Sequence, residues 1–573
     1  MSRRSSFVHK LILCILSCLM FLPTAFGSVI PMEREQVIQR SNAIFVATVV
    51  GKKVRWNEQG NMIVTDYHFQ VEKGLWGKMD ELIFLTFAGG ELDGEKHQIH
   101  GVPEYGLEER VILMVEDLER PLFSPVTGMY QGSFIESFDE RDGRSMVLNG
   151  EGEPILFKGE TIPFEAFVDV LIDEIPEAKA KPVPSLELPD HLRHLAIPTE
   201  KLPALKYDRN DDLIFEDGWE PPTRKFDLEL DRDIRDEYIK EEGEEGEPGH
   251  YDSDGKDKHN HHAHSKWSYS NRAKNVPIVF NPLPSGGLIG LHDQYAMAYW
   301  NKYSDIFRVR TSTGSWAWGN GRYDIAGFQS NATMVSQFGS GWGATTLAVC
   351  WKRWDWTGFS VESDIAMNPA FSWTTNDYDT YSNANLFNAD RTLLHEVGHS
   401  WGLDHQFNFL SVMNYAPHKY RAYTVLSGDD TMAVRAAFSG RTVNRTDLGV
   451  ALYYNTGFQS YSDSTLNKIY VRKGDTIRIS NFMVENTGTT TINTPTIRWY
   501  LVPNINSWGS NRYIGTTTHS SLARDHYWLT ARTLTIPEST PTGWYYIGAF
   551  VGTSGDSVWQ NNSSWCGRRI FVY

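Results

Sequence analysis

Three histidines and a glutamate between residues 395 and 405 have the types and spacing of a metal-dependent hydrolytic site. The segment reads His-Glu-Val-Gly-His-Ser-Trp-Gly-Leu-Asp-His. Successive helical residues advance by about 100°, so His395 and His399 lie one turn apart on the same face and their imidazoles converge. A catalytic zinc ion takes three protein ligands and keeps a fourth position for water. We therefore predict a zinc ion held by His395, His399 and His405.

Gly402 is the residue that must end the helix. If the helix continued, His405 would lie about 15 Å along the axis from His395, out of bonding reach. Glycine accepts a positive φ without steric cost, so the chain can turn at Gly402 and return His405 to the metal. Glu396 is the predicted catalytic base. Zinc lowers the pKa of its bound water to about 7. Glu396 takes a proton from this water and delivers the proton to the leaving amine.

The complete pattern resembles the metzincin signature His-Glu-x-x-His-x-x-Gly-x-x-His. The run Ser411-Val412-Met413-Asn414-Tyr415 is similar to the Met-turn of that family, which forms a floor beneath the zinc ligands. The resemblance implies a zinc-dependent endopeptidase that hydrolyses peptide bonds of protein or peptide substrates. A catalytically inactive adhesin would be expected to have lost Glu396, and a purely structural zinc site would place a fourth Cys or His between His405 and His418; neither is found.

Within the metzincins the chain is most similar to matrixins, over about residues 270–440. Residues 426–435 resemble the closing helix of that family, and residues 362–368 resemble its substrate-lining edge strand. The resemblance implies an α+β catalytic domain over residues 266–440. Calcium is an expectation from the resemblance alone, because the sequence has no Asp-x-Asp loop of the EF-hand type.

Two features depart from the matrixin pattern. No cysteine lies between Ser28 and Val349, so a propeptide thiolate cannot cap the zinc from the N-terminal side. Tyr415 follows Met413 by two positions, a spacing similar to that of astacins and serralysins, whose tyrosine reaches the zinc or the oxyanion. Tyr415 is therefore a second candidate catalytic residue, with a role in the core as the alternative.

The N-terminus has the pattern of a secretory signal peptide over residues 1–27. Basic residues precede the apolar run Leu11 to Leu22, and small residues precede Ser28. The run is too short to span a bilayer, so we expect a secreted or extracellular protein that does not span the membrane; periplasmic or cell-surface retention stays open. A lipoprotein anchor at Cys18 is the alternative.

The rest of the chain predicts a multidomain protein. A length of 573 residues suggests three or four units, and the net charge of -17 argues against a nucleic-acid partner. Period-two apolar runs predict an N-terminal all-β barrel over residues 28–165 and an Ig-like β-sandwich over residues 441–573. Between the barrel and the catalytic domain, a Pro-rich, acidic and His-rich linker is predicted over residues 166–265.

Several questions stay open at this level. The histidines of the linker either hold metal or are simply solvated; they are His250, His259, His261, His262 and His264. This cluster is the nearest candidate for covering the zinc, and the linker is the predicted site of maturation cleavage. Cys350 and Cys566 either form a disulfide or are two buried thiols. The oligomeric state is not predicted.

Overall fold

The structure of the chain is a computed structural model. It describes residues 29–30, 32, 34–138, 143–150, 154–157, 160–182, 206–207, 213–214, 249–250, 266–267, 278–280, 296, 299–304, 311–312, 323–354, 359–374, 386–403, 405, 411–413, 425–437, 442–457, 460–503, 511–553, 555–556, 558 and 561–573. The predicted signal peptide, the alternative anchor Cys18, Tyr415 and residues 251–265 of the histidine-rich tract lie outside this range.

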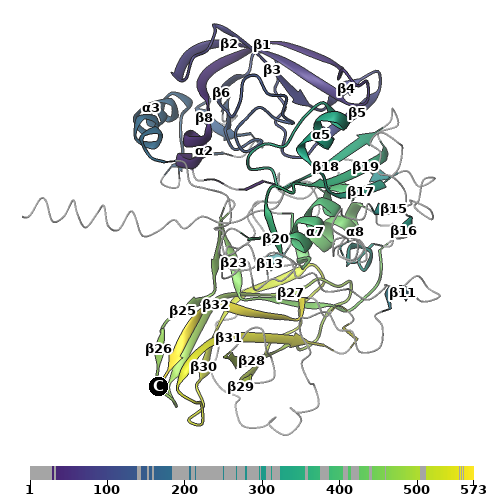
Figure 1. The fold of residues 1–573 in the computed structure, drawn as a ribbon. Coiled ribbons are helices and arrows are strands. Elements are labelled where there is room, and N and C mark those ends of the chain that lie inside the picture. Colours follow the sequence, from purple (N-terminus) through teal and green to yellow (C-terminus); the bar gives the residue numbers. More distant parts are fainter. Residues whose placement is uncertain are drawn as a thin grey trace, which may run out of the picture.

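The N-terminal unit, residues 29–182, is built on one antiparallel sheet (Figure 1). Its spatial order is β3 (Leu82–Ala88), β2 (Ile63–Trp76), β1 (Ala43–Trp56), β6 (Arg110–Val115), β7 (Ser133–Phe138) and β8 (Ser145–Asn149). Within the described residues this sheet ends at β3 and at β8, so it is open and the prediction of a barrel was wrong. Period-two patterning predicts strands, but closure also depends on strand number and stagger, which that pattern does not encode.

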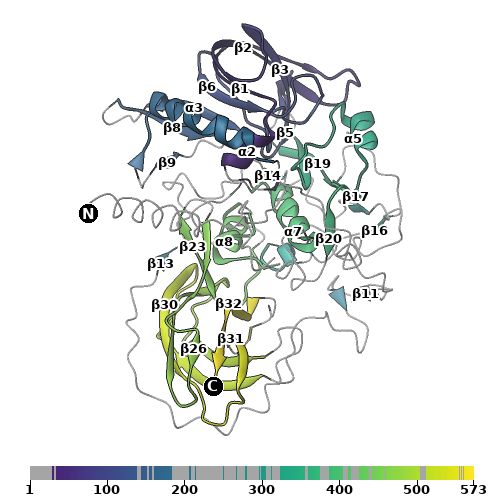
Figure 2. The same cartoon turned by 60° about the vertical axis from the view of Figure 1, so that its left-hand side comes forward.

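Two helices pack against one face of this sheet instead (Figure 2). α2 (Arg34–Arg40) and α3 (Phe164–Ala180) bury their apolar sides against residues of β1, β6, β7 and β8. Residues 166–180, predicted to be linker, are therefore helical and belong to the N-terminal unit. Phe164, Phe167 and Leu171 recur at helical spacing, but Pro176, which lies inside α3, suggested an extended chain.

The middle unit, residues 266–437, carries a sheet that it shares with the N-terminal unit. The order is β16 (Thr311–Ser312), β15 (Ile278–Phe280), β17 (Tyr323–Phe328), β19 (Phe359–Met367), β18 (Ala348–Trp354), β5 (Glu95–Ile99) and β4 (Gly90–Leu92), and β14 (Lys266–Trp267) also pairs with β19. β4 and β5 form a hairpin of the N-terminal unit. β19 has β17 on one side and β18 on the other, so the prediction that residues 362–368 form an edge strand was wrong.

The two units also share a hydrophobic core. It contains Met62, Ile99 and Phe123 from the N-terminal unit together with Phe338 and Trp351 from the middle unit. Every one of these side chains is almost completely buried. Because each unit supplies part of the same core, the N-terminal unit is packed onto the middle unit rather than joined to it only by a tether.

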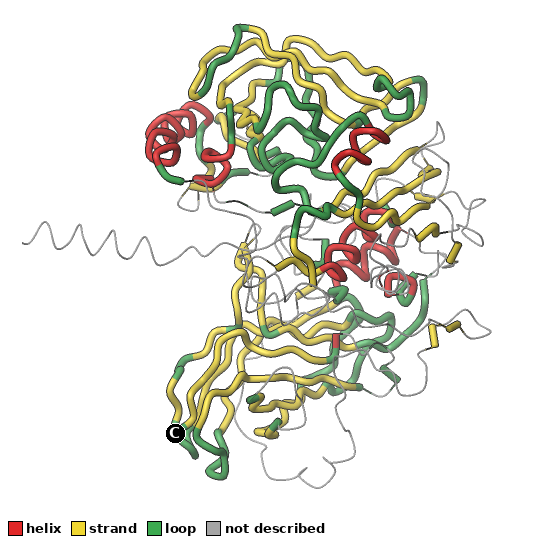
Figure 3. Tube along the Cα trace, viewed as in Figure 1, coloured by secondary structure: helices red, strands yellow, loops and turns green. Residues whose placement is uncertain are grey.

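Two of the described helices of the middle unit, α7 (Ala389–Ser400) and α8 (Gly428–Ala437), lie between the two β-rich ends of the molecule, and a third, α5 (Asn331–Phe338), lies beside the N-terminal sheet (Figure 3). Two short strands, β20 (Ser372–Thr374) and β21 (Leu386–Asn388), pair immediately before α7. In the described part of the chain, no helix has both the length and the apolar character needed to cross a bilayer.

The C-terminal unit, residues 442–573, is a sandwich of two sheets around one core. One sheet contains β22 (Leu448–Ala451), β27 (Thr476–Asn486), β30 (His526–Thr535), β25 (Thr465–Leu466) and the linker strand β13 (Gly249–His250). The other contains β26 (Tyr470–Val471), β32 (Ser563–Val572), β31 (Gly543–Gly552), β28 (Thr496–Val502) and β29 (Arg512–Thr518). β23 (Tyr453–Gly457) and β24 (Ser460–Asp463) form a separate hairpin.

The two cysteines in the described residues are not joined by a disulfide. Cys350 is buried in the core of the middle unit, and Cys566 is buried in the core of the sandwich. The disulfide alternative therefore fails, because each residue acts as a small buried hydrophobe in a different core.

Candidate metal centre

α7 carries two of the predicted ligands on one buried face. Its N-cap is Asn388, whose side chain accepts a hydrogen bond from the Arg391 backbone N–H at 2.9 Å and so satisfies one of the free donors of the first turn. His395 and His399 follow one turn apart, and neither has exposed surface (0%). The helix thus presents two imidazoles from a well-capped segment.

The chain turns after α7 at the predicted residue. Gly402 has φ 91°, a conformation that favours glycine, and its N–H donates to the His399 carbonyl at 2.8 Å. Leu403 N–H donates back to Gly398 O at 3.2 Å, which closes the end of the helix. The turn returns His405, which is 8% exposed, to the face that carries the other two histidines. The predicted role of Gly402 is therefore confirmed.

The three histidines meet in a near-equilateral triangle of nitrogens. Nε2 of His395 lies 3.1 Å from Nε2 of His399 and 3.2 Å from Nε2 of His405, and the remaining side, from His399 to His405, is 3.0 Å. Zinc–nitrogen bonds of about 2.0–2.1 Å in a tetrahedral site would separate the nitrogens by about 3.3–3.4 Å. Among the described residues this is the group with the geometry to hold a metal ion.

Backbone carbonyls orient two of the rings. His395 Nδ1 lies 2.8 Å from the Val412 carbonyl oxygen, and His399 Nδ1 lies 2.8 Å from the Leu403 carbonyl oxygen. A carbonyl only accepts, so both Nδ1 atoms carry the hydrogen and both Nε2 atoms present a lone pair. Lone pairs that face one another in a buried site repel unless a cation lies between them, so the donor set fits a metal ion.

The same surroundings keep these ligands neutral. Burial, and then the positive charge that His405 would carry, hold the pKa of His395 well below its ordinary value of 6.5. For His399 burial is again the main cause of a pKa well below 6.5, followed by His100 and His405. Since a metal binds only the deprotonated imidazole, the site favours the form that binds.

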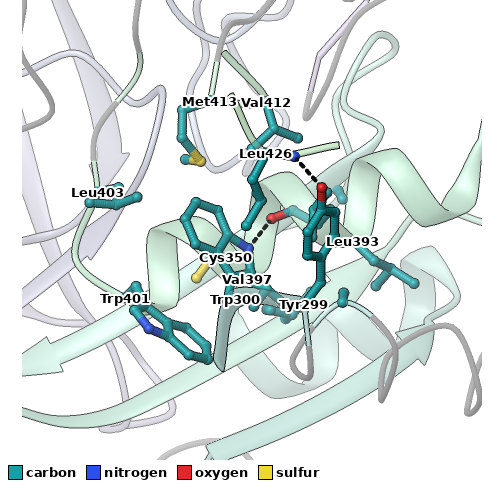
Figure 4. Packing of buried hydrophobic residues seen from close by; sticks show 14 of the residues in the cluster. Tyr299, Trp300, Cys350, Leu393, Val397, Trp401, Leu403, Val412, Met413 and Leu426 are labelled. Carbon is teal, nitrogen blue, oxygen red and sulfur yellow. Dashed lines mark hydrogen bonds between the residues drawn. The ribbon is translucent and has the colours of Figure 1, made fainter. Parts of the chain in front are cut away.

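Met413 packs beside α7 at the position of Gly398 and belongs to the buried cluster drawn in Figure 4. A side chain at Gly398 would collide with the Met413 sulfur and would lie 2.8 Å from the Trp300 ring. The Trp300 indole also donates to the Leu394 carbonyl at 2.9 Å, as drawn in Figure 4. The motif therefore needs glycine at 398 because Met413 and Trp300 occupy the space beside the helix.

Asp430 of α8 holds the turn that contains Met413. Its carboxylate accepts hydrogen bonds from the Ser411 hydroxyl at 2.5 Å and from the Val412 N–H at 2.9 Å. Because the Val412 carbonyl oxygen accepts the hydrogen bond from His395, Asp430 supports the orientation of His395 indirectly, by holding Val412. Sequence reasoning assigned this region to a helix but gave Asp430 no role.

Glu396 lies on α7 between the ligands and is completely buried. The negative charge of Glu396, after burial itself, raises the pKa of the Cys350 thiol to about 12. The carboxylate therefore lies near β18, the strand that packs against α7. The position of Tyr415 is outside the described residues, so its predicted role stays a prediction.

His100, from the N-terminal unit, lies against the metal ligands and was not predicted. Its ring stacks on the His399 ring with centroids 3.9 Å apart and an interplanar angle of 7°. It also meets the His405 ring edge-on at 6.3 Å. His100 is separated from the motif by almost 300 residues, so nothing in the local sequence indicates the contact.

The comparisons with known proteins identify no family. No family profile and no curated protein matches the chain. The CARDB domain of a Pyrococcus furiosus protein, solved with two metal ions, is 17% identical and covers 23% of this chain and 96% of its own, with a TM-score of 0.16. Spo0M, a sporulation control protein from Bacillus subtilis, is 13% identical and covers 23% of this chain and 50% of its own, with a TM-score of 0.14. These likenesses are too weak to carry an argument.

The fold and the site together define a β-rich protein of several units with a buried three-histidine group able to bind a metal. Anything more specific about its activity is a proposal.

Proposed function

We propose that this chain is an exported zinc-dependent endopeptidase of the metzincin type, similar to matrixins. The observation that supports the proposal best is the triangle of Nε2 atoms, with sides of 3.0, 3.1 and 3.2 Å, at the end of a helix that also carries Glu396. The motif, the Gly402 turn and the packing of Met413 are what the family resemblance predicts.

Each residue has a distinct task in this proposal. His395, His399 and His405 would hold the ion, and the carbonyls of Val412 and Leu403 would keep two of those rings oriented. The ion, when bound, would acidify a water molecule and polarise the peptide carbonyl. Glu396 would accept the proton from that water and pass it to the leaving amine.

The test uses the full-length protein in four forms: wild type, Glu396→Gln, His399→Ala and His100→Ala. Elemental analysis should find one zinc per chain in the wild type and in Glu396→Gln, and a large loss in His399→Ala. Digestion of a mixed peptide library, followed by mass spectrometry, should find cleavage by the wild type and by His100→Ala, and none by Glu396→Gln or by His399→Ala. The His100→Ala form is included because His100 covers the site. Cleavage retained in Glu396→Gln would overturn the assigned role of this residue.

A further inference from the structure

β18 is the point at which the middle unit meets the N-terminal unit. On one side it pairs with β19 along its whole length. On the other side it pairs antiparallel with β5, through Trp351 with Ile99, Lys352 with Gln98, Arg353 with His97 and Trp354 with Lys96. Without β5, this stretch of β18 would be an open edge, and an open edge binds an extended peptide by adding it as a further strand.

β18 also lies directly against the helix that carries the ligands. The Cys350 sulfur is 3.4 Å from the Ser400 hydroxyl, one residue after His399. A peptide added along the edge of β18 would therefore run past the metal centre. That is the place where β5 now lies.

The end of β5 leads from this edge to the ligands. Side chains alternate between the two faces of a strand. Ile99 points into the core shared by the two units, and the next residue, His100, reaches the opposite face and stacks on His399. His100 is 9% exposed and His405 is 8% exposed, so the group of rings is almost closed to solvent.

His100 covers the ligand group without joining it. The nitrogens close enough to share one ion, within the described residues, are those of His395, His399 and His405. A parallel ring stacked at 3.9 Å on His399 leaves no room for water or a peptide between the two rings. The contact is therefore a cover over one face of the site.

The hairpin is held in place by the N-terminal sheet. His97 Nδ1 accepts a hydrogen bond from the Ile63 backbone N–H at 3.0 Å, and its ring meets Trp351 edge-on at 4.9 Å. Gly89, just before the hairpin, donates to the Ile63 carbonyl at 2.9 Å. The N-terminal unit thus positions the hairpin, and the hairpin positions His100.

We propose that the N-terminal unit is a built-in inhibitor: the β4–β5 hairpin occupies the edge of β18 that an extended peptide substrate would use, and His100 covers the metal ligands. This regulation rests on the proposed peptidase function. Among the described residues, His100 is a histidine outside the motif that the structure brings to the site; the alternative that the linker histidines cover the zinc falls on residues 259–264, outside the described range. Removal of the hairpin from β18 would open the edge and the metal together.

The experiment uses the full-length, zinc-loaded protein, and either removes the covering ring or locks the hairpin in place. His100→Ala removes the cover and leaves the strand pairing. The double variant Gln98→Cys with Lys352→Cys joins a directly facing pair, whose Cα separation in an antiparallel ladder suits a disulfide. His68→Ala is the matched control, because the His68 ring also contacts an aromatic ring, meeting that of Phe84 edge-on, but on the N-terminal sheet alone.

Two readouts are compared in every variant: the rate of zinc extraction by EDTA, and cleavage of the mixed peptide library. His100→Ala should release zinc about tenfold faster or more, and His68→Ala should match the wild type. The double-cysteine variant should release zinc more slowly when oxidised than when reduced, and should cleave peptides only when reduced. Circular dichroism of each variant checks that the fold is retained.

The outcomes separate this inference from the proposed function. If the extraction rate is the same in His100→Ala, in the oxidised variant and in the wild type, the inhibitory role is overturned. If the oxidised variant cleaves peptides as fast as its reduced form, the inhibitory role also fails while the peptidase function stands. If extraction responds as expected but no variant cleaves any peptide, the cover is real and the peptidase proposal fails. If the reduced double variant does not fold, the rate of zinc extraction from His100→Ala decides whether the inhibitory role stands.

Discussion

The two β-rich ends of this protein meet the middle unit, which carries the three histidines, in different ways. The N-terminal unit adds two strands to the central sheet, shares its core and reaches the ligands through His100. The C-terminal sandwich has its own core and meets α8 through polar contacts: the Gly428 N–H donates to Glu485 at 2.7 Å, and Arg435 donates to the Thr487 carbonyl at 2.7 Å and also pairs with Asp525.

This difference separates two ways of acting on a site. The N-terminal unit lies over the ligands, so it can control access to them. The C-terminal unit contacts the helix that carries Asp430, which holds the turn behind the ligands, so it can affect only their orientation. The N-terminal unit shares a whole buried cluster with the middle unit, whereas the sandwich adds Val558 to the core of the middle unit and meets that unit largely through polar contacts such as Tyr303 with Asp447. A larger shared core couples the folding of two units more strongly.

The largest expected effect is on the free energy of unfolding. It is tested by replacing two buried tryptophans, one in each kind of core. Trp351→Ala removes a side chain from the core shared by the N-terminal and middle units, and should cost about 3–5 kcal/mol of stability in both. Trp499→Ala removes an equally buried side chain from the sandwich and should destabilise the C-terminal unit alone. Hydrogen exchange followed by mass spectrometry assigns the loss to each unit. Increased exchange in the middle unit but not the N-terminal unit of Trp351→Ala would show that the two fold independently.

A smaller effect is expected at Asp430, which lies on the helix that the sandwich contacts. Asp430→Ala leaves Ser411 and Val412 without their acceptor and should lower zinc affinity about 10- to 100-fold, as loss of outer-shell support does at other sites. Asp525→Ala, which breaks the pairing with Arg435 at the far end of α8, should have a lesser effect. Competition with a fluorescent zinc chelator measures both. An equal loss of zinc affinity in the two variants would contradict this ranking, and would mean that a change at either end of α8 disturbs the ligands to the same extent.

The smallest effect concerns the pH dependence of N-terminal packing. Burial, and then the charge of Arg353, lower the pKa of His97 from 6.5 to about 3. In the unfolded chain His97 takes up a proton below pH 6.5, whereas the folded form resists it. The stability that His97 contributes is therefore complete above pH 6.5 and decreases on acidification, by at most about 1.4 kcal/mol per pH unit down to about pH 3.

Urea unfolding of wild type and His97→Gln between pH 8 and pH 5 tests this dependence. The stability difference between the two proteins should narrow as the pH falls below 6.5, because only the wild type has this proton to take up. A constant difference across the range would mean that His97 is not held neutral in the folded protein.

Local sequence was sufficient for the parts of the protein that lie close together along the chain. The spacing of His395 and His399, the need for a turn at Gly402 and the return of His405 all follow from helix geometry and glycine stereochemistry, and the structure confirms them. Period-two patterning also located the two β-rich ends. It failed for α3, where Pro176 outweighed a helical apolar period, and for the barrel, because closure is a property of the whole sheet.

By itself, the sequence determined which histidines come together, the turn that assembles them and the β-rich character of both ends. Each of these features depends on residues that lie close to one another along the chain. Tertiary structure alone decided that β5 pairs with β18, that Cys350 and Cys566 lie in separate cores, and that His100 covers His399. Pairing between distant strands depends on which faces become buried together, and no local period records that choice.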